Sequence, residues 1–171
     1  MRSILRAGFN TLDEWRQIWQ RLREGLRYPA IAYMDTDQSL TTAFADMSGT
    51  GLLVATNTNY AFKFHLSCDA NATTTGIDVA VNGPSNSNGI TYTQLYWTSA
   101  TAAARAGSTS YDNDTASTDS NGTSRRLFEV YGIFRNGSNE GTLIGRAKRE
   151  NVGSATVRAG SYGMLWPLEW S

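Results

Sequence analysis

The pattern of apolar residues changes its period near residue 39. Before that point, apolar residues recur at alternating spacings of three and four positions, which places them along one stripe of an α-helix. Thr11 and Glu14 form a capping box at the start of this segment. We therefore expect an amphipathic helix over about 11–26, inside an N-terminal helical arm of residues 1–38, with a stripe made of Leu12, Trp15, Trp19, Leu22 and Leu26.

The stripe of the expected helix is narrow, closer to the seam of a coiled coil than to the broad face of a core helix. A helix of about two heptads is marginal in water unless its apolar side is covered. Three covering partners are compatible with the pattern: the chain's own domain, sister subunits, or another protein on which the helix docks.

After residue 39 apolar and polar residues alternate with a period of two, which is typical of half-buried β-strands. In residues 60–68 one face carries Tyr60, Phe62, Phe64, Leu66 and Cys68, and the other carries Lys63, His65 and Ser67. Shorter alternating runs follow, separated by Gly, Asn and Ser. Strands of this kind without helices between them pair antiparallel. The pattern predicts an all-β fold over 39–171, an antiparallel jelly-roll-like sandwich of about eight strands.

Residues 99–124 interrupt this alternation. The segment holds 11 Ser and Thr residues and no aliphatic side chain larger than Ala. It offers too little apolar surface to offset the entropy lost on ordering, so we expect a long loop. The loop could become ordered by lying across a neighbouring subunit, or it could be a flexible surface loop.

Charge and cysteine content narrow the possible environments. Lys and Arg together number 15, as do Asp and Glu, but both ends of the chain are basic and the middle is acidic. This distribution fits self-assembly or docking on a charged surface and gives no overall attraction to nucleic acid. Cys68 stands alone, so we expect it to be a small buried residue. We find no signal peptide and no run of 18 apolar residues, and expect no membrane partner.

The sequence offers few groups for catalysis or metal binding. His65 is the only histidine, and in a strand it points to the opposite face from Cys68, so the two cannot form a nucleophile and base. Asp112, Asp114 and Asp119 resemble part of a calcium loop but lack the Gly and Glu that such a loop requires. We therefore expect no enzymatic activity, no cofactor and no metal.

Two groups of residues remain as candidate contact sites. Large aromatic residues near strand ends could stack on a sugar or fill a core or subunit interface: Trp97, Trp166 and Trp170. Basic residues in the C-terminal part could form a patch that meets an acidic neighbour: Arg125, Arg126, Arg146, Lys148 and Arg149. The basic group lacks the interleaved aromatic residues that nucleic-acid binding favours.

Three segments give the chain a resemblance to a known family. They are LLVATNTNYAFKF (52–64), ATTTGIDVAVNGP (72–84) and GIFRNGSNEGTLIGRAKRENVGSATVRAGSYGML (132–165). Together they resemble a β-rich jelly-roll module of tailed-bacteriophage virion structural proteins, of the capsid decoration, cement or tail-fibre type. The N-terminal 28 residues lie outside this resemblance.

The resemblance implies a structural role in a virion. We expect a capsid decoration or cement protein that stabilises the phage head shell by multivalent contacts, assembled as a homotrimer on the major capsid protein or another virion protein. Its expected location is the particle surface, after synthesis in the host cytoplasm. A tail, neck or fibre component, or a host-glycan-binding module, is the alternative.

Overall fold

The computed structural model describes residues 29–99, 101–115 and 124–168. The helix expected over 11–26, with its apolar stripe, lies outside the described residues, as does Trp170. The described chain is all β: it forms twelve strands in two sheets, and each recorded strand pair is antiparallel. No helix that could cross a membrane is found among these residues.

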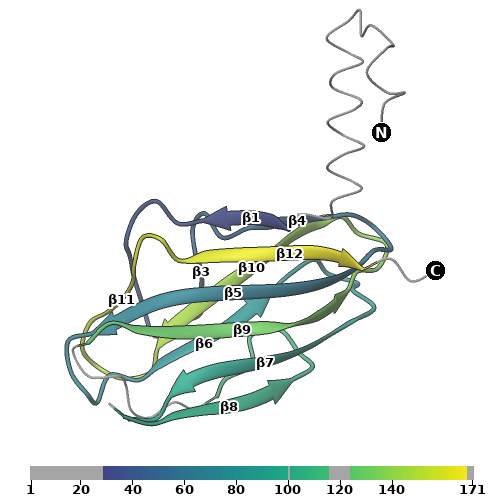
Figure 1. Ribbon diagram of the computed structural model, residues 1–171. Coiled ribbons are helices and arrows are strands. Elements are labelled where there is room, and N and C mark those ends of the chain that lie inside the picture. The colour runs from purple at the N-terminus through teal and green to yellow at the C-terminus, as the bar shows by residue number, and fades with distance from the viewer. Residues whose placement is uncertain (1–28, 100, 116–123, 169–171) are drawn as a thin grey trace, which may run out of the picture.

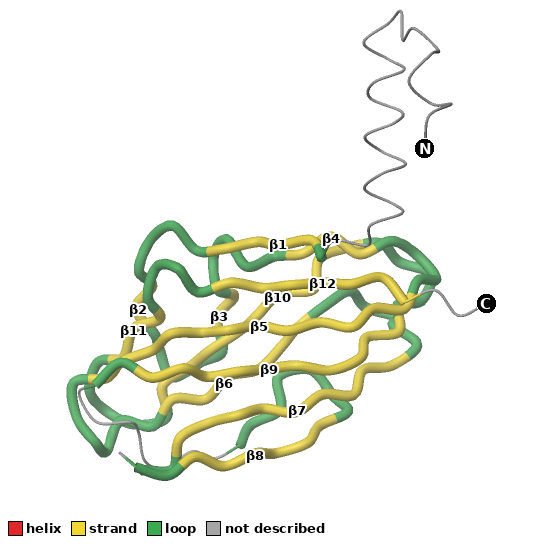
Figure 2. Tube along the Cα trace, viewed as in Figure 1, coloured by secondary structure: helices red, strands yellow, loops and turns green. Residues whose placement is uncertain are grey.

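The two sheets lie one behind the other (Figures 1 and 2). The large sheet has the order β1-β12-β5-β9-β7-β8, with β11 and β2 attached beside β5, and the small sheet places β10 between β6 on one side and β3 and β4 on the other. The strands of the large sheet are β1 (Ala30–Tyr33), β2 (Gln38–Ser39), β5 (Asn59–Ala70), β7 (Gly89–Trp97), β8 (Ala103–Ser108), β9 (Arg126–Arg135), β11 (Ala155–Val157) and β12 (Tyr162–Leu168). Those of the small sheet are β3 (Ala45–Asp46), β4 (Leu52–Val54), β6 (Ile77–Asn82) and β10 (Gly141–Arg149).

The core between the sheets confirms the alternation read from residues 60–68. All five apolar side chains of that face are buried, and Phe64 near its middle is 0% exposed. Gly163 on β12 and Gly145 on β10 lie beside the Phe64 ring, where an added Cβ would come within 2.6 and 3.1 Å of it. The two glycines therefore leave the space that this ring fills. Burial of a side chain of this kind contributes about 1.5–3 kcal/mol.

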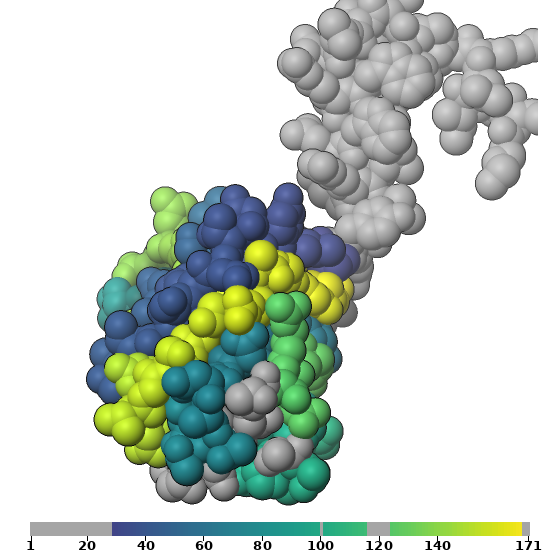
Figure 3. All heavy atoms as spheres, turned by 90° about the vertical axis from the view of Figure 1, so that its left-hand side faces the viewer, coloured from purple at the N-terminus to yellow at the C-terminus, as the bar shows by residue number. Residues whose placement is uncertain are grey.

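The sandwich begins earlier in the chain than the alternating pattern indicated. Ala30–Tyr33 forms β1 and pairs with β12, with Ile31 opposite Met164 and Tyr33 opposite Tyr162. In Figure 3 the early, dark blue segments and the yellow C-terminal segment lie against each other. The end of the range 1–38, which the sequence assigned to a helical arm, is thus part of the large sheet. Four residues are too few for a periodic signal.

The segment 99–124 is not one long loop. Ala103–Ser108 forms β8, which pairs with β7 at the edge of the large sheet. An edge strand gains its order from main-chain pairing, so its lack of large apolar residues did not prevent it from forming. Residues 109–115, which we call the strap, then run along the open edge of β6, where the Asp112 amide donates to the Val81 carbonyl at 3.2 Å. Residues 116–123 lie outside the description.

Candidate functional site

The outer face of the large sheet carries the side chains that point away from the core. The strand registers align these side chains in three rows that run across the sheet. The first row is Trp166, Ala61, Ile133 and Thr91; the second is Ile31, Met164, Lys63, Tyr131 and Thr93; the third is Tyr33, Tyr162, His65, Glu129, Leu95 and Arg105. We call this set of three rows the outer face. Most of its members are aromatic or aliphatic.

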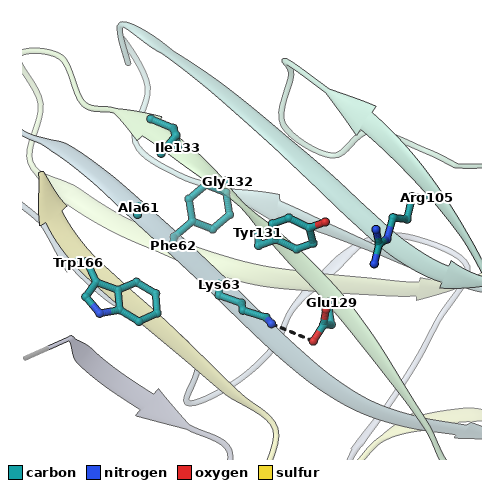
Figure 4. Close-up of a pocket in the computed structure, with 9 residues that line it drawn as sticks. All are labelled: Ala61, Phe62, Lys63, Arg105, Glu129, Tyr131, Gly132, Ile133 and Trp166. Carbon is teal, nitrogen blue, oxygen red and sulfur yellow. Dashed lines mark ion pairs between the residues drawn. The ribbon is translucent and has the colours of Figure 1, made fainter.

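A shallow hollow lies in the outer face, where a small side chain stands between large ones. Ala61 on β5 separates Trp166 on β12 from Ile133 on β9. The hollow measures about 540 Å³, and Tyr131 and Lys63 lie in the next row (Figure 4). It is a dent in a flat surface made by residue size, not a cleft between structural elements.

The centre of the outer face is polar but electrically balanced. Glu129 accepts from Lys63 Nζ at 3.0 Å and lies 3.2 Å from His65 Nδ1, and the His65 ring stacks on Tyr162 with centroids 4.7 Å apart. Burial lowers the pKa of His65, and the charge of Lys63 lowers it further, while Glu129 opposes both. His65 is therefore neutral at pH 7, and Lys63 and Glu129 cancel.

These contacts cover most of the His65 side chain. Its side chain is only 13% exposed, because Tyr162 on the neighbouring strand covers the ring. Its recorded partners are Glu129, Lys63 and Tyr162, and none of them is a serine or cysteine nucleophile. Cys68 lies in the core on the other side of β5, as predicted, and burial raises the pKa of its thiol.

The structure does not bring the five predicted basic residues into one patch. Arg125 and Arg126 lie at the start of β9 in the large sheet, whereas the other three lie on β10 in the small sheet. Arg126 is placed over the Trp97 ring, 4.8 Å from its centroid. Arg149 donates to the main-chain carbonyls of Leu40 and Asn151.

The remaining two basic residues, Arg146 and Lys148, hold the strap. Arg146 pairs with Asp112 of the strap and with Asp46, and Lys148 pairs with Asp114 and, at 3.0 Å, with Glu150. Both cations are thus neutralised within the chain. They act as structural anchors in this arrangement and leave little charge for an outside partner.

Three carboxylates meet where the strap packs on the small sheet. Oxygen atoms of Asp78, Asp114 and Glu150 lie within 4.8 Å of one another, but Lys148 already occupies the position of a counter-ion. Burial raises the pKa of Asp78 to about 7, and Thr115 donates to both of its oxygens. A hard divalent cation would have to displace Lys148 and the Thr115 contacts. The donor set therefore fits a strap anchor better than a cation cage.

Trp97 and Trp166, the two predicted tryptophans within the described residues, do not share one platform. Trp166 lies in the first row of the outer face, whereas Trp97 ends β7 and donates its Nε1 hydrogen to the Leu127 carbonyl at 3.0 Å. The Trp97 position is three rows away along the strands, which corresponds to about 20 Å. Sequence reasoning missed Ile31, Tyr33 and Tyr131 as neighbours of this surface.

Comparisons with family models, curated proteins and solved structures find no match to this chain. Among the described residues, the outer face carries two of the large apolar side chains that are exposed in the single chain, Ile31 and Tyr33.

Proposed function

We propose that the chain is a structural protein of a phage virion, most simply a capsid decoration or cement protein that adds to the head shell in many copies. The observation that carries this proposal is the outer face, a broad surface on which most side chains are aromatic or aliphatic. Exposed apolar patches of this extent mark interaction surfaces. A sheet with apolar side chains on both faces is expected to gain another layer.

The connectivity supports the jelly-roll classification on which the proposal builds. Successive strands β4, β5 and β6 alternate between the small and large sheets, and the chain crosses again between β6 and β7 and between β9 and β10. Such alternation is typical of double-sheet jelly rolls. Jelly-roll bodies are used as rigid units in capsids and lectins, so the connectivity fits either a particle role or a sugar-binding role.

The mechanism we propose is adhesion through many weak contacts. Copies of the chain associate as a homotrimer, and each copy also contacts the major capsid protein or another virion protein. Repeated attachment sites on one assembly raise the overall binding strength far above that of a single contact. The apolar stripe over 11–26 supplies a second attachment element in this proposal, either to the shell or to sister subunits.

The proposal is tested by the copy number of the chain in purified particles of the phage that encodes it. Quantitative mass spectrometry against the major capsid protein measures this ratio. Hundreds of copies per particle support the decoration role. A small multiple of three or six moves the protein to the tail, neck or fibre, and absence from the particle overturns the proposal.

A second candidate function is host-glycan binding, which the hollow favours. Trp166 and Tyr131 supply aromatic rings beside it, and Lys63 and Arg105 supply hydrogen-bond donors (Figure 4). Retention of the purified chain on immobilised glycans, lost in a folded Trp166→Ala variant, would support this function. An unretained chain would contradict it.

A further inference from the structure

We propose that the outer face of the large sheet is the surface through which a second copy of this chain binds. This inference rests on the proposed function for its place in an assembly. A contact between two copies of the same face closes as a pair, so it is separate from the contacts that hold the proposed homotrimer together. The inference follows from the exposure, extent and charge of the face.

The exposure of the face is greatest along its β1 edge. Ile31 is 61% exposed and Tyr33 is 67% exposed, although both continue rows whose other members are packed side by side. Met164 and Tyr162 lie directly opposite them on β12. The apolar rows therefore run to the edge of the sheet without being closed by a polar rim on that side. An additional layer of protein would bury them.

The sheet that carries the outer face is large enough for a stable protein contact. The six strands from β1 to β8 in sheet order contain 48 residues. Each residue of a sheet covers about 16 Å², from a rise of about 3.4 Å and a strand spacing of about 4.8 Å. The projected area of the whole sheet is thus about 780 Å², and the three rows occupy part of it. A standard interface buries roughly 800 Å² of accessible surface on each partner, so the sheet is large enough to carry one.

The charge of the face suits a second copy of itself. Within its three rows the charged residues are Lys63, Glu129 and Arg105, and the first two form an ion pair at 3.0 Å. His65 is neutral at pH 7, so each face keeps only the charge of Arg105, which lies at the β8 edge, and two faces can approach with little repulsion. The small sheet differs, because Arg146 and Lys148 on its outer side are paired with the acidic strap.

The hollow gives the face a place to receive a side chain from the partner. It lies between Trp166 and Ile133 because Ala61 is small. A saccharide would use the hollow and the adjacent rings but would leave the exposed β1 edge of the face, with Ile31 and Tyr33, uncovered. A protein surface of matching size would bury both parts, so the observations favour a second copy over a sugar.

The test is the mass of the purified full-length chain by sedimentation equilibrium. We expect an oligomer whose mass is an integer multiple of 18.7 kDa. Ala61→Arg places a long cation in the hollow on the outside of the sheet, and Ile31→Lys charges the exposed edge. Each should raise the dissociation constant about 100-fold or more, equivalent to about 2.8 kcal/mol.

The matched control is Leu53→Lys, which charges an 82% exposed apolar residue of β4 in the small sheet. It should leave the dissociation constant unchanged within about twofold, and circular dichroism should show that all three variants are folded. An unchanged oligomer in the Ala61→Arg variant overturns the proposal, because the copies then meet elsewhere, for example through residues 1–28.

Other outcomes separate this inference from the proposed function. A wild-type chain that is monomeric at about 100 µM overturns the interface even if the chain is abundant in purified particles. A monomer whose retention on a glycan column is lost in the Ala61→Arg variant assigns the face to sugar binding and also overturns it. An oligomer held by this face but absent from particles keeps the interface and removes the virion role.

Discussion

Gln94 joins the two sheets and the strap through one buried amide. It lies on β7 and is 0% exposed. Its Nε2 donates to the Val79 carbonyl of β6 at 2.6 Å and to the Asn113 carbonyl of the strap at 2.8 Å, while its Oε1 accepts from Asn113 Nδ2 at 3.1 Å. We predict that Gln94→Leu, which keeps the size but removes all three hydrogen bonds, destabilises the fold and loosens the strap.

The size of the destabilisation depends on how buried the groups are that lose their hydrogen bonds to Gln94. Val79 is fully buried, so its carbonyl loses a partner that water cannot replace, at a cost of about 1–3 kcal/mol. Asn113 is partly exposed and can turn to water, so its two lost bonds cost about 1 kcal/mol together. The expected loss in the free energy of unfolding is about 2–4 kcal/mol, which lowers Tm by about 2–4 °C for each kcal/mol.

Urea unfolding followed by tryptophan fluorescence measures this loss, and limited proteolysis reports on the strap. The control is Gln38→Leu, because Gln38 also bridges two main-chain groups, the Asp46 carbonyl and the Ser48 amide, but lies partly exposed. It should cost less than about 1 kcal/mol. Equal losses in the two variants, or a Gln94→Leu loss below about 1 kcal/mol, would refute the reasoning.

Three further predictions concern packing and pH. Gly163→Ala should lower the free energy of unfolding by about 1–3 kcal/mol, because its Cβ would lie 2.6 Å from the Phe64 ring. In a double-mutant cycle Phe64→Leu should offset part of this loss, and strictly additive effects would contradict the prediction. Burial raises the pKa of Asp78 to about 7, so between about pH 4 and 7 the folded state holds a proton that the unfolded state releases. The free energy of unfolding should therefore fall as the pH rises from about 4 through 7. The urea midpoint of Asp78→Asn should fall less over the same range. Burial lowers the pKa of His65 below 6.5, so the folded state favours the neutral imidazole. Its contribution to the free energy of unfolding should be full above pH 6.5 and be lost as the pH decreases through the folded pKa. Thermal melts of His65→Gln should lack this loss.

The burial pattern of single strands could be predicted from the sequence. Phe62, Phe64 and Leu66 alternate with polar residues, and alternation alone assigns them to the core face. The rows of the outer face could not be predicted, because they depend on register. Lys63 lies opposite Tyr131, 68 positions away in the chain, and no local pattern specifies which of many offsets the strands adopt.

The strap could have been found from a signal that the sequence does contain. Asp112 and Asp114 are two positions apart, and so are Arg146 and Lys148, with which they pair. Two acids and two bases with the period of a strand indicate two extended segments side by side. The acids were instead compared with a calcium loop, which they do not complete, and their spacing was considered without that of their partners. The buried contact of Asp78 with Thr115 had no comparable signal.

The pairing of β1 with β12 determines when the outer face comes into existence. These are the first and last strands of the described chain, and Ile31 and Tyr33 become part of the outer face only when β12 lies beside them. During translation β1 must therefore wait until every other strand has emerged, and pairing over such long sequence separations is slow. A nascent or truncated chain cannot present the complete surface. Under the proposed contact between copies, association therefore requires β1 and β12 to be paired first.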